Sequence, residues 1–142
     1  KRGAKRLLLD DVLYQKVDIL FPCAVQGVIT ESNMNKLQCK LLVEGANNPC
    51  SEQVRSALWE KGIKIIPDFI ANPGGIIAAF VEMSSTITPE ENVRTRKNVE
   101  DAKKLTRERI SANVTSIMKL VQELSVEPQH AGKYLALKNI FK

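Results

Sequence analysis

Three short apolar runs in the first half of the chain predict β-strands. They occupy residues 17–22 (VDILFP), 40–45 (KLLVEG) and 63–68 (IKIIPD), at regular intervals along the sequence. Each run is almost wholly apolar rather than alternating, which is typical of strands covered on both faces in a parallel sheet.

Helix-like segments fill the two intervals between these runs. Residues 30–38 (TESNMNKLQ) offer Thr30 as an N-cap, and residues 51–62 (SEQVRSALWEKG) offer Ser51 as an N-cap and Gly62 at the C′ position. The order strand–helix–strand–helix–strand predicts right-handed crossovers in a parallel sheet. The predicted fold class is α/β.

The second half of the chain follows a helical period. Residues 76–83 continue as an apolar helix, and Thr88, Pro89 and Glu91 form a capping box that opens the next one. That helix runs for about 35 residues with one apolar stripe. Its spacing does not keep a strict heptad, so we expect it to pack within its own domain or on a domain outside this chain. Pro128 separates it from a last short helix at residues 129–141.

Charge and composition are those of an ordinary globular protein. The 142 residues carry a net charge of +5, with 26% charged and 5% aromatic residues. The basic residues at 94–109 (RTRKNVEDAKKLTRER) are interleaved with acids, which favours a solvated helix face over a nucleic-acid surface. A basic interaction module that uses this face is kept as an alternative.

The cysteine and histidine content argues against a metal site. Cys23, Cys39 and Cys50 form no CxxC pair, and His130 is the single histidine. We expect reduced thiols in a cytoplasmic protein, no metal, and neither a signal peptide nor a membrane span.

Small and polar residues follow each predicted strand. They form the segments 22–27 (PCAVQG), 44–49 (EGANNP) and 67–75 (PDFIANPGG). Ligands of open parallel sheets bind beyond the carboxyl ends of the strands, so three such loops favour a binding site over simple turns.

The last of these loops leads into the apolar helix. Asn72 is suited to the N-cap and Pro73 to the first helical position, while Gly74 and Gly75 leave the first-turn amides unshielded. Such a helix start can hold an anion or a polar group, and the glycines admit a flat ring. Tight packing of two helices at the glycines is the alternative.

These motifs, taken in order, resemble the glutamate/leucine/phenylalanine/valine dehydrogenase family, most closely its glutamate dehydrogenase branch. The resemblance is carried by DILFPCAVQGVITESN (18–33), LLVEGANNPCSEQ (41–53), GIKIIPDFIANPGGIIAAFVEM (62–83) and AGKYLALKNI (131–140). It implies an enzyme that oxidatively deaminates an amino acid to a 2-oxo acid and ammonia, with NAD or NADP as cofactor.

The resemblance also implies a role for each matching position. Cys23 and Ala24 would lie near the dinucleotide backbone. The nicotinamide and its ribose would be approached by Gly45, Ala46, Asn47, Asn72, Gly74 and Gly75. Ile76 and Ala79 would face the substrate side chain.

Two positions depart from the family pattern. Pro73 stands where Ala is more usual, which should only stiffen the helix start. Ala79 stands where glutamate-specific members commonly carry Ser, so a leucine- or phenylalanine-type dehydrogenase is the alternative within the family. A non-catalytic regulatory or interaction module derived from the fold is the alternative outside it.

The missing motifs predict that the chain is a fragment. It contains no G-x-G-x-x-G turn for the pyrophosphate, and the family's catalytic Lys and Asp belong to a substrate domain that it lacks, so no catalytic residue is assigned. We expect residues 1–84 to form the second half of a Rossmann-type, three-layer NAD(P)-binding domain with about three parallel strands. Residues 85–142 would form a carboxyl-terminal segment, a long helix and a short one, that packs back on it. The parent would be a homo-hexamer acting on a small molecule, without nucleic-acid or membrane partners.

Overall fold

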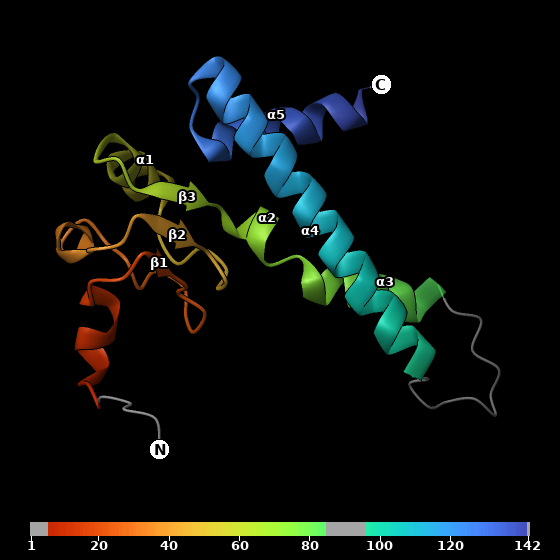
Figure 1. Cartoon of the computed structure of the whole chain (residues 1–142), viewed down its shortest axis with the longest axis horizontal. Coiled ribbons are helices and arrows are strands. Elements are labelled where there is room, and N and C mark those ends of the chain that lie inside the picture. The colour runs from red at the N-terminus through yellow and green to blue at the C-terminus, as the bar shows by residue number, and fades with distance from the viewer. Residues whose placement is uncertain (1–5, 85–95, 142) are drawn as a thin grey trace. The chain divides into compact units, whose positions relative to one another are not determined.

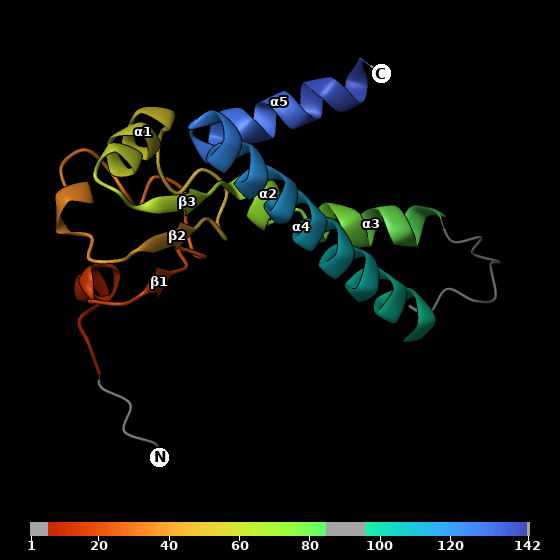
Figure 2. The ribbon, with the colours of Figure 1, turned by 45° about the horizontal axis from the view of Figure 1, so that its top comes forward.

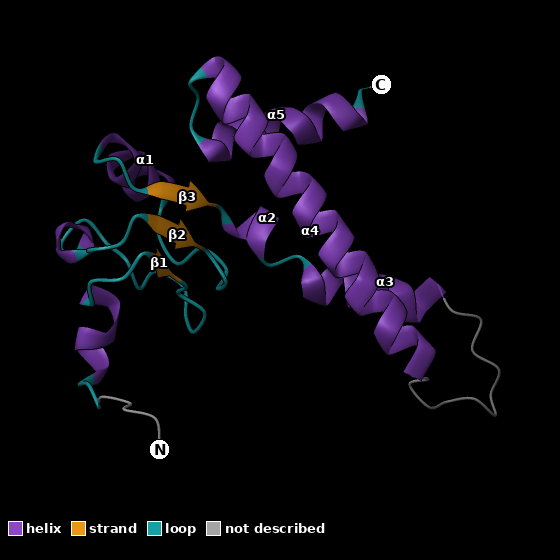
Figure 3. Cartoon of the chain, in the orientation of Figure 1, coloured by secondary structure: helices purple, strands orange, loops and turns teal. Residues whose placement is uncertain are grey.

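The computed structural model describes residues 6–84 and 96–141, in two compact units. The sheet unit comprises Lys1–Asp68 and the helical unit Phe69–Lys142. The elements are η1 (Leu9–Tyr14), β1 (Ile19–Leu20), η2 (Met34–Lys36), β2 (Leu41–Val43), α1 (Glu52–Glu60), β3 (Lys64–Ile66), α2 (Asp68–Ala71), α3 (Gly74–Ser84), α4 (Arg96–Leu124) and α5 (Pro128–Ile140) (Figures 1 and 3). The predicted division at residue 84, between the second half of a cofactor-binding domain and a carboxyl-terminal helical segment, stays a prediction.

The three strands form one parallel sheet in the order β1-β2-β3. Leu42 in the central strand β2 is aligned with Leu20 of β1 and with Ile65 of β3. Each strand lies inside an apolar run of the sequence, although the paired segments are shorter than the runs. The predicted α/β class with three parallel strands, a long helix and a final short helix is confirmed.

Helix α1 begins and ends at the residues that the sequence predicts. The Ser51 side chain accepts a hydrogen bond from the Val54 amide at 3.2 Å. At the other end Gly62 has φ +84, its amide donates to the Trp59 carbonyl, and the Ile63 amide donates to that of Leu58. This pair of hydrogen bonds is the Schellman motif, which requires a left-handed residue at C′.

The helix predicted for residues 30–38 is wrong. The structure has only turns and the three-residue 3-10 helix η2 there. The Asn33 side chain accepts from the Thr30 amide at 2.8 Å and donates to the Val28 carbonyl at 2.9 Å. An Asn side chain that bonds the neighbouring backbone competes with helical hydrogen bonds, which explains the turn.

A single apolar cluster holds the sheet unit together. Leu42 and Leu58 are fully buried at its centre, so the middle strand and α1 contribute its best-covered side chains. The other buried members are Ile29, Leu37, Cys39, Cys50, Val54, Ile63 and Ile65.

Helix α4 packs against both α3 and α5 within the helical unit (Figures 1 and 2). The long amphipathic helix thus has two helices of its own unit to pack against. Its described length is 29 residues, and the capping box of Thr88, Pro89 and Glu91 lies outside the described residues. The helix ends before Ser125, whose φ of +52 places it in the left-handed region.

A glycine on α5 allows a close contact inside the helical unit. A Cβ atom at Gly132 would lie 2.7 Å from Cε2 and 3.0 Å from Cζ of Phe69. The Ile117 Cδ1 atom would be 3.5 Å from the same Cβ position. The missing side chain at position 132 therefore makes room for the Phe69 ring.

Helix α3 departs from expectation in its burial. A helix that is apolar almost all round, as residues 76–83 are, is expected to be buried, but Ile76 is 79% exposed, Phe80 63% and Met83 85%. These three residues repeat at i, i+4 and i+7 and therefore share one side of the helix. Because α4 covers another side, the apolar stripe alone did not determine burial.

None of the helices in the described part of the chain combines the length and the apolar character that crossing a membrane requires.

Candidate functional site

The loops that follow β1 and β2 lie side by side at one edge of the sheet. The Ala46 amide donates to the Pro22 carbonyl at 2.8 Å. Farther along, the Gly27 amide donates to the Asn48 carbonyl at 2.9 Å. The predicted site residues of these loops, at 23–24 and 45–47, are therefore brought together because β1 and β2 are adjacent and parallel.

Gly45 allows the closest approach between the two loops. A Cβ atom at this position would lie 2.5 Å from the Cys23 Sγ atom and 3.5 Å from the Pro22 carbonyl oxygen. Any larger residue requires the Cys23 side chain to rotate away. The glycine is thus explained by packing between the loops, and this requirement is separate from any contact with a ligand.

The five predicted positions differ in what they present to solvent. Cys23, Ala24 and Asn47 are exposed and Gly45 is half-buried, whereas Ala46 is 8% exposed and its amide is bonded to Pro22. Ala46 thus joins the two loops, and the exposed neighbours are the ones that a ligand can reach.

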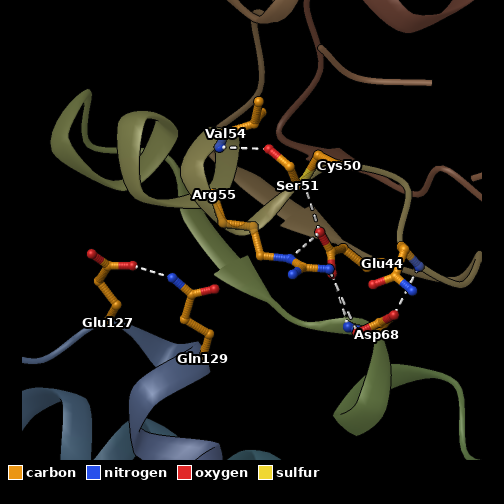
Figure 4. Close-up of polar contacts among 9 residues, drawn as sticks. Glu44, Cys50, Ser51, Val54, Arg55, Asp68, Glu127 and Gln129 are labelled. Carbon is orange, nitrogen blue, oxygen red and sulfur yellow. Dashed lines mark hydrogen bonds and ion pairs between the residues drawn. The ribbon is translucent and has the colours of Figure 1, made fainter. Parts of the chain in front are cut away.

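A buried carboxylate lies directly below the second loop. Glu44 is 0% exposed, and its Oε1 atom accepts from Cys50 Sγ at 3.0 Å and from Arg55 Nε at 2.9 Å. Its Oε2 atom accepts from the same Nε at 3.0 Å and from the Asp68 amide at 2.9 Å (Figure 4). A buried charge with this many donors is well compensated.

Asp68 extends this network to the end of the loop. Its Oδ2 atom accepts a hydrogen bond from the backbone amide of Asn48 at 2.8 Å, and its Oδ1 atom lies 3.6 Å from Arg55 Nη2. Asn48 has φ +44, a left-handed conformation that non-glycine residues adopt at a cost. Among the described residues, Arg55 Nη2 is buried and has no hydrogen-bond partner within range.

Sequence patterns did not single out Glu44, Arg55 and Asp68 as a network. The available signal was a carboxylate at the end of two apolar runs, KLLVEG and IKIIPD, and an Arg beside the apolar face of α1. Their convergence depends on β2 and β3 being neighbours with α1 packed on them, which only the tertiary structure establishes.

Burial and hydrogen bonding shift the pKa of Arg55 in opposite directions and the pKa of Cys50 in the same direction. Burial lowers the pKa of Arg55, but the hydrogen bonds and charge of Glu44 outweigh burial, and the pKa is raised above its ordinary value. Burial and then the hydrogen bond to Glu44 both raise the pKa of the Cys50 thiol. Burial also raises the pKa of Cys39.

The raised pKa of Cys50 predicts how stability changes in alkali. The folded state keeps a proton on the Cys50 thiol that the unfolded state releases above the ordinary thiol pKa of 9.0. The contribution of this thiol to the free energy of unfolding is therefore fully present below pH 9. Above it, we expect a loss of up to about 1.4 kcal/mol per pH unit from this thiol. Cys50→Ser keeps a donor for Glu44 and removes the titration, so its stability should fall less steeply between about pH 9 and 10.

Urea titrations in reductant at several pH values measure these slopes. Cys23→Ser is the matched control, because the Cys23 thiol is exposed. It should keep the wild-type slope. Equal slopes for Cys50→Ser and wild type would contradict the expectation.

The remaining predicted site residues belong to the helical unit. Asn72 and Gly74 are half-buried, whereas Gly75, Ile76 and Ala79 are exposed. Helix α3 begins at Gly74, one residue later than predicted, and the Pro73 carbonyl accepts from the Ile77 amide at 3.0 Å.

The two glycines at the start of α3 have different surroundings. A Cβ atom at Gly74 would be 3.3 Å from Cγ2 of Thr106 on α4, so this glycine supports close helix packing. A Cβ atom at Gly75 would meet nothing within 4 Å among the described residues. Gly75 therefore leaves space beside the backbone, and its contact with a flat ring stays a prediction.

In the part of the chain that the structure describes, no three His, Cys, Asp or Glu side chains are grouped so as to hold a metal ion.

Comparison with known proteins defines the protein family to which the chain belongs. The family model described as Glutamate/Leucine/Phenylalanine/Valine dehydrogenase matches residues 2–142. The chain belongs to this family. The resemblance predicted from the loop motifs is thereby confirmed.

Within the family, the chain is similar in sequence to glutamate dehydrogenases. The chain is 43% identical over 70 residues to the NADP(+)-dependent glutamate dehydrogenase of Pyrobaculum calidifontis, covering 49% of this chain and 17% of that protein. It is 36% identical over 110 residues to the glutamate dehydrogenase of Aeropyrum pernix, covering 72% and 26%. The chain thus spans about a sixth to a quarter of the length of these relatives.

A solved structure shows the same fold. L-tryptophan dehydrogenase from Nostoc punctiforme matches 97% of this chain and 39% of its own, with a TM-score of 0.81 and 26% identity. The hetero-hexameric glutamate dehydrogenase from Thermus thermophilus matches 96% and 32%, with a TM-score of 0.72. At 18% identity, this second likeness concerns the fold alone.

Proposed function

We propose that this chain is part of an NAD(P)-dependent amino-acid dehydrogenase that converts L-glutamate to 2-oxoglutarate and ammonia. The observation that carries this function is the family match over residues 2–142. The names of the relatives in Pyrobaculum calidifontis and Aeropyrum pernix, both glutamate dehydrogenases, support glutamate as the substrate.

In this function the chain binds and orients a nicotinamide dinucleotide, which accepts hydride from the amino acid when bound. Cys23 and Ala24 would lie along the dinucleotide backbone, and Gly45, Ala46 and Asn47 beside the nicotinamide ribose. The exposed position of Asn47 fits this role. The chain has no G-x-G-x-x-G turn, so no residue in it is assigned to the pyrophosphate.

Nicotinamide and substrate contacts are also proposed for residues of the helical unit. Asn72, Gly74 and Gly75 would form the floor beside the nicotinamide, and the open space at Gly75 is compatible with a flat ring. Ile76 and Ala79 would face the substrate side chain, and both are exposed, as this requires.

The full-length protein encoded by the gene that contains this sequence tests the function. We expect it to reduce NAD or NADP with L-glutamate and to catalyse the reverse amination of 2-oxoglutarate. The 142-residue chain alone should show no measurable rate and only weak nucleotide binding by calorimetry. A full-length protein that oxidises no amino acid would contradict the proposed function.

A second substrate class is favoured by one observation. Ile76 and Ala79 are apolar, and the structural relative from Nostoc punctiforme is a dehydrogenase of L-tryptophan, an amino acid with a large apolar side chain. If this class applies, the full-length protein should turn over leucine or phenylalanine with a higher kcat/KM than glutamate. The same assay with the three amino acids therefore decides between them.

Three further features of the whole protein stay proposals: a cytoplasmic location, a homo-hexameric assembly and the absence of nucleic-acid binding. The alternative of a basic interaction module makes a distinct prediction. It requires that the chain bind nucleic acid with an affinity that falls steeply with salt.

A further inference from the structure

The most extensive polar network of the sheet unit lies directly under the loop that carries Asn47. Glu44 and Asn48 are the two ends of that loop, and both are bonded to Asp68. We propose that Asp68, held by Glu44 and Arg55, is a positioning residue that fixes the backbone of residues 45–48 for the nicotinamide nucleotide. This inference rests on the proposed function for its catalytic consequence.

The hydrogen bonds form a closed ring around the loop. The Glu44 side chain accepts from the Asp68 amide at 2.9 Å, and the Asp68 side chain accepts from the Asn48 amide at 2.8 Å. The backbone from Glu44 to Asn48 completes the ring. The two ends of the loop are thus tied to the same residue, which restricts the conformations open to residues 45–47 between them.

Arg55 determines the orientation of the carboxylate at the first end. Its Nε atom lies 2.9 and 3.0 Å from the two Glu44 oxygens (Figure 4). Its Nη2 atom is 3.6 Å from Asp68 Oδ1, so the same guanidinium faces both carboxylates. The positive charge offsets the repulsion between two carboxylates that must lie near each other in the interior.

The conformation of Asn48 explains why a charged acceptor is placed at the second end. Its φ of +44 is unfavourable for a residue with a Cβ atom. A hydrogen bond from its amide to a carboxylate is stronger than one to a neutral oxygen and can offset this cost. Asn47, which precedes this residue, therefore has its backbone direction determined by Asp68.

The first arm of the test needs no nucleotide and uses the 142-residue chain. In Asp68→Ala we expect hydrogen exchange of the Asn48 amide to accelerate by roughly ten- to a hundredfold, as for loss of a bond to a charged group. Asp68→Asn keeps an acceptor and should give an intermediate rate. Asp18→Ala is the matched control, because Asp18 pairs with Lys40 on the surface, and it should leave the rate unchanged.

The second arm measures nucleotide use by the full-length protein. Asp68→Ala should raise KM for the nucleotide by a larger factor than it lowers kcat. Asn48→Gly in the same background should recover part of the loss, because glycine adopts positive φ without steric cost. The recovery should appear in KM for the nucleotide rather than in kcat, which separates loop positioning from a general gain in stability.

The outcomes separate this role from the proposed function. Unchanged Asn48 exchange in Asp68→Ala would overturn the positioning role, as would an active full-length protein whose Asp68→Ala kinetics equal those of Asp18→Ala. An inactive wild-type protein would contradict the proposed function instead. The hydrogen-exchange rates of the Asn48 backbone amide would then show by themselves whether Asp68 holds the loop.

Discussion

Arg55→Met should destabilise the sheet unit by about 3–5 kcal/mol, the cost of breaking a buried ion pair from one side. Glu44 is 0% exposed, and the substitution leaves its carboxylate in the interior without the guanidinium that now bonds both of its oxygens. The donors that remain, the Cys50 thiol and the Asp68 amide, carry no charge. Since whole domains are stable by only about 5–15 kcal/mol, the variant should be close to unfolding.

Urea unfolding followed by Trp59 fluorescence measures this effect, because the single tryptophan lies on α1 and reports on the sheet unit. Lys40→Met is the matched control. It breaks the 2.7 Å pair with Asp18, in which both side chains are more than three-quarters exposed, and should change stability little.

A second substitution distinguishes the loss of charge pairing from the loss of packing. Glu44→Gln in the Arg55→Met background removes the uncompensated charge while keeping the shape of the side chain. The double variant should be more stable than Arg55→Met alone. A double variant that is less stable, by the sum of the two single effects, would show that the pair does not act as a unit.

Leu42→Ala should cost about 2–5 kcal/mol, the range for truncating a fully buried leucine. Leu42 is 0% exposed at the centre of β2, between strands β1 and β3. The neighbouring strands are held by backbone hydrogen bonds and cannot collapse fully into the space that the truncation leaves.

Ile19→Ala is the control for this substitution, because it removes a similar side chain from the same sheet. Ile19 lies in the edge strand β1 and is 48% exposed, so its truncation creates no closed cavity. We expect a clearly smaller loss of stability in the same urea experiment. Comparable losses for the two variants would mean that β1 is covered in solution.

Arg55→Met and Leu42→Ala both affect the candidate loops, because the strand and the network that they weaken lie directly below those loops. The loop after β2 begins where Leu42 and Glu44 secure the strand, and it is bonded to the loop after β1 through Ala46 and Pro22. A destabilised sheet would therefore displace the predicted cofactor positions 23–24 and 45–47 together. This coupling distinguishes the loops from surface turns that tolerate change independently.

The sequence by itself determined the elements and the class of the protein. Continuous apolar runs predicted three parallel strands, Ser51 and Gly62 marked the ends of α1, and ordered loop motifs identified the dehydrogenase family. These features are local, or depend on the order of motifs, and a linear pattern contains both.

Only the tertiary structure decided which residues meet and which are covered. Residues 30–38 form turns because the Asn33 side chain bonds the backbone, and Ile76, Phe80 and Met83 are exposed although their pattern is apolar. Glu44, Arg55 and Asp68 converge because two parallel strands and one helix are adjacent. Such neighbours are far apart in sequence, so no local periodicity encodes their contact, and burial depends on what packs against a face rather than on its composition.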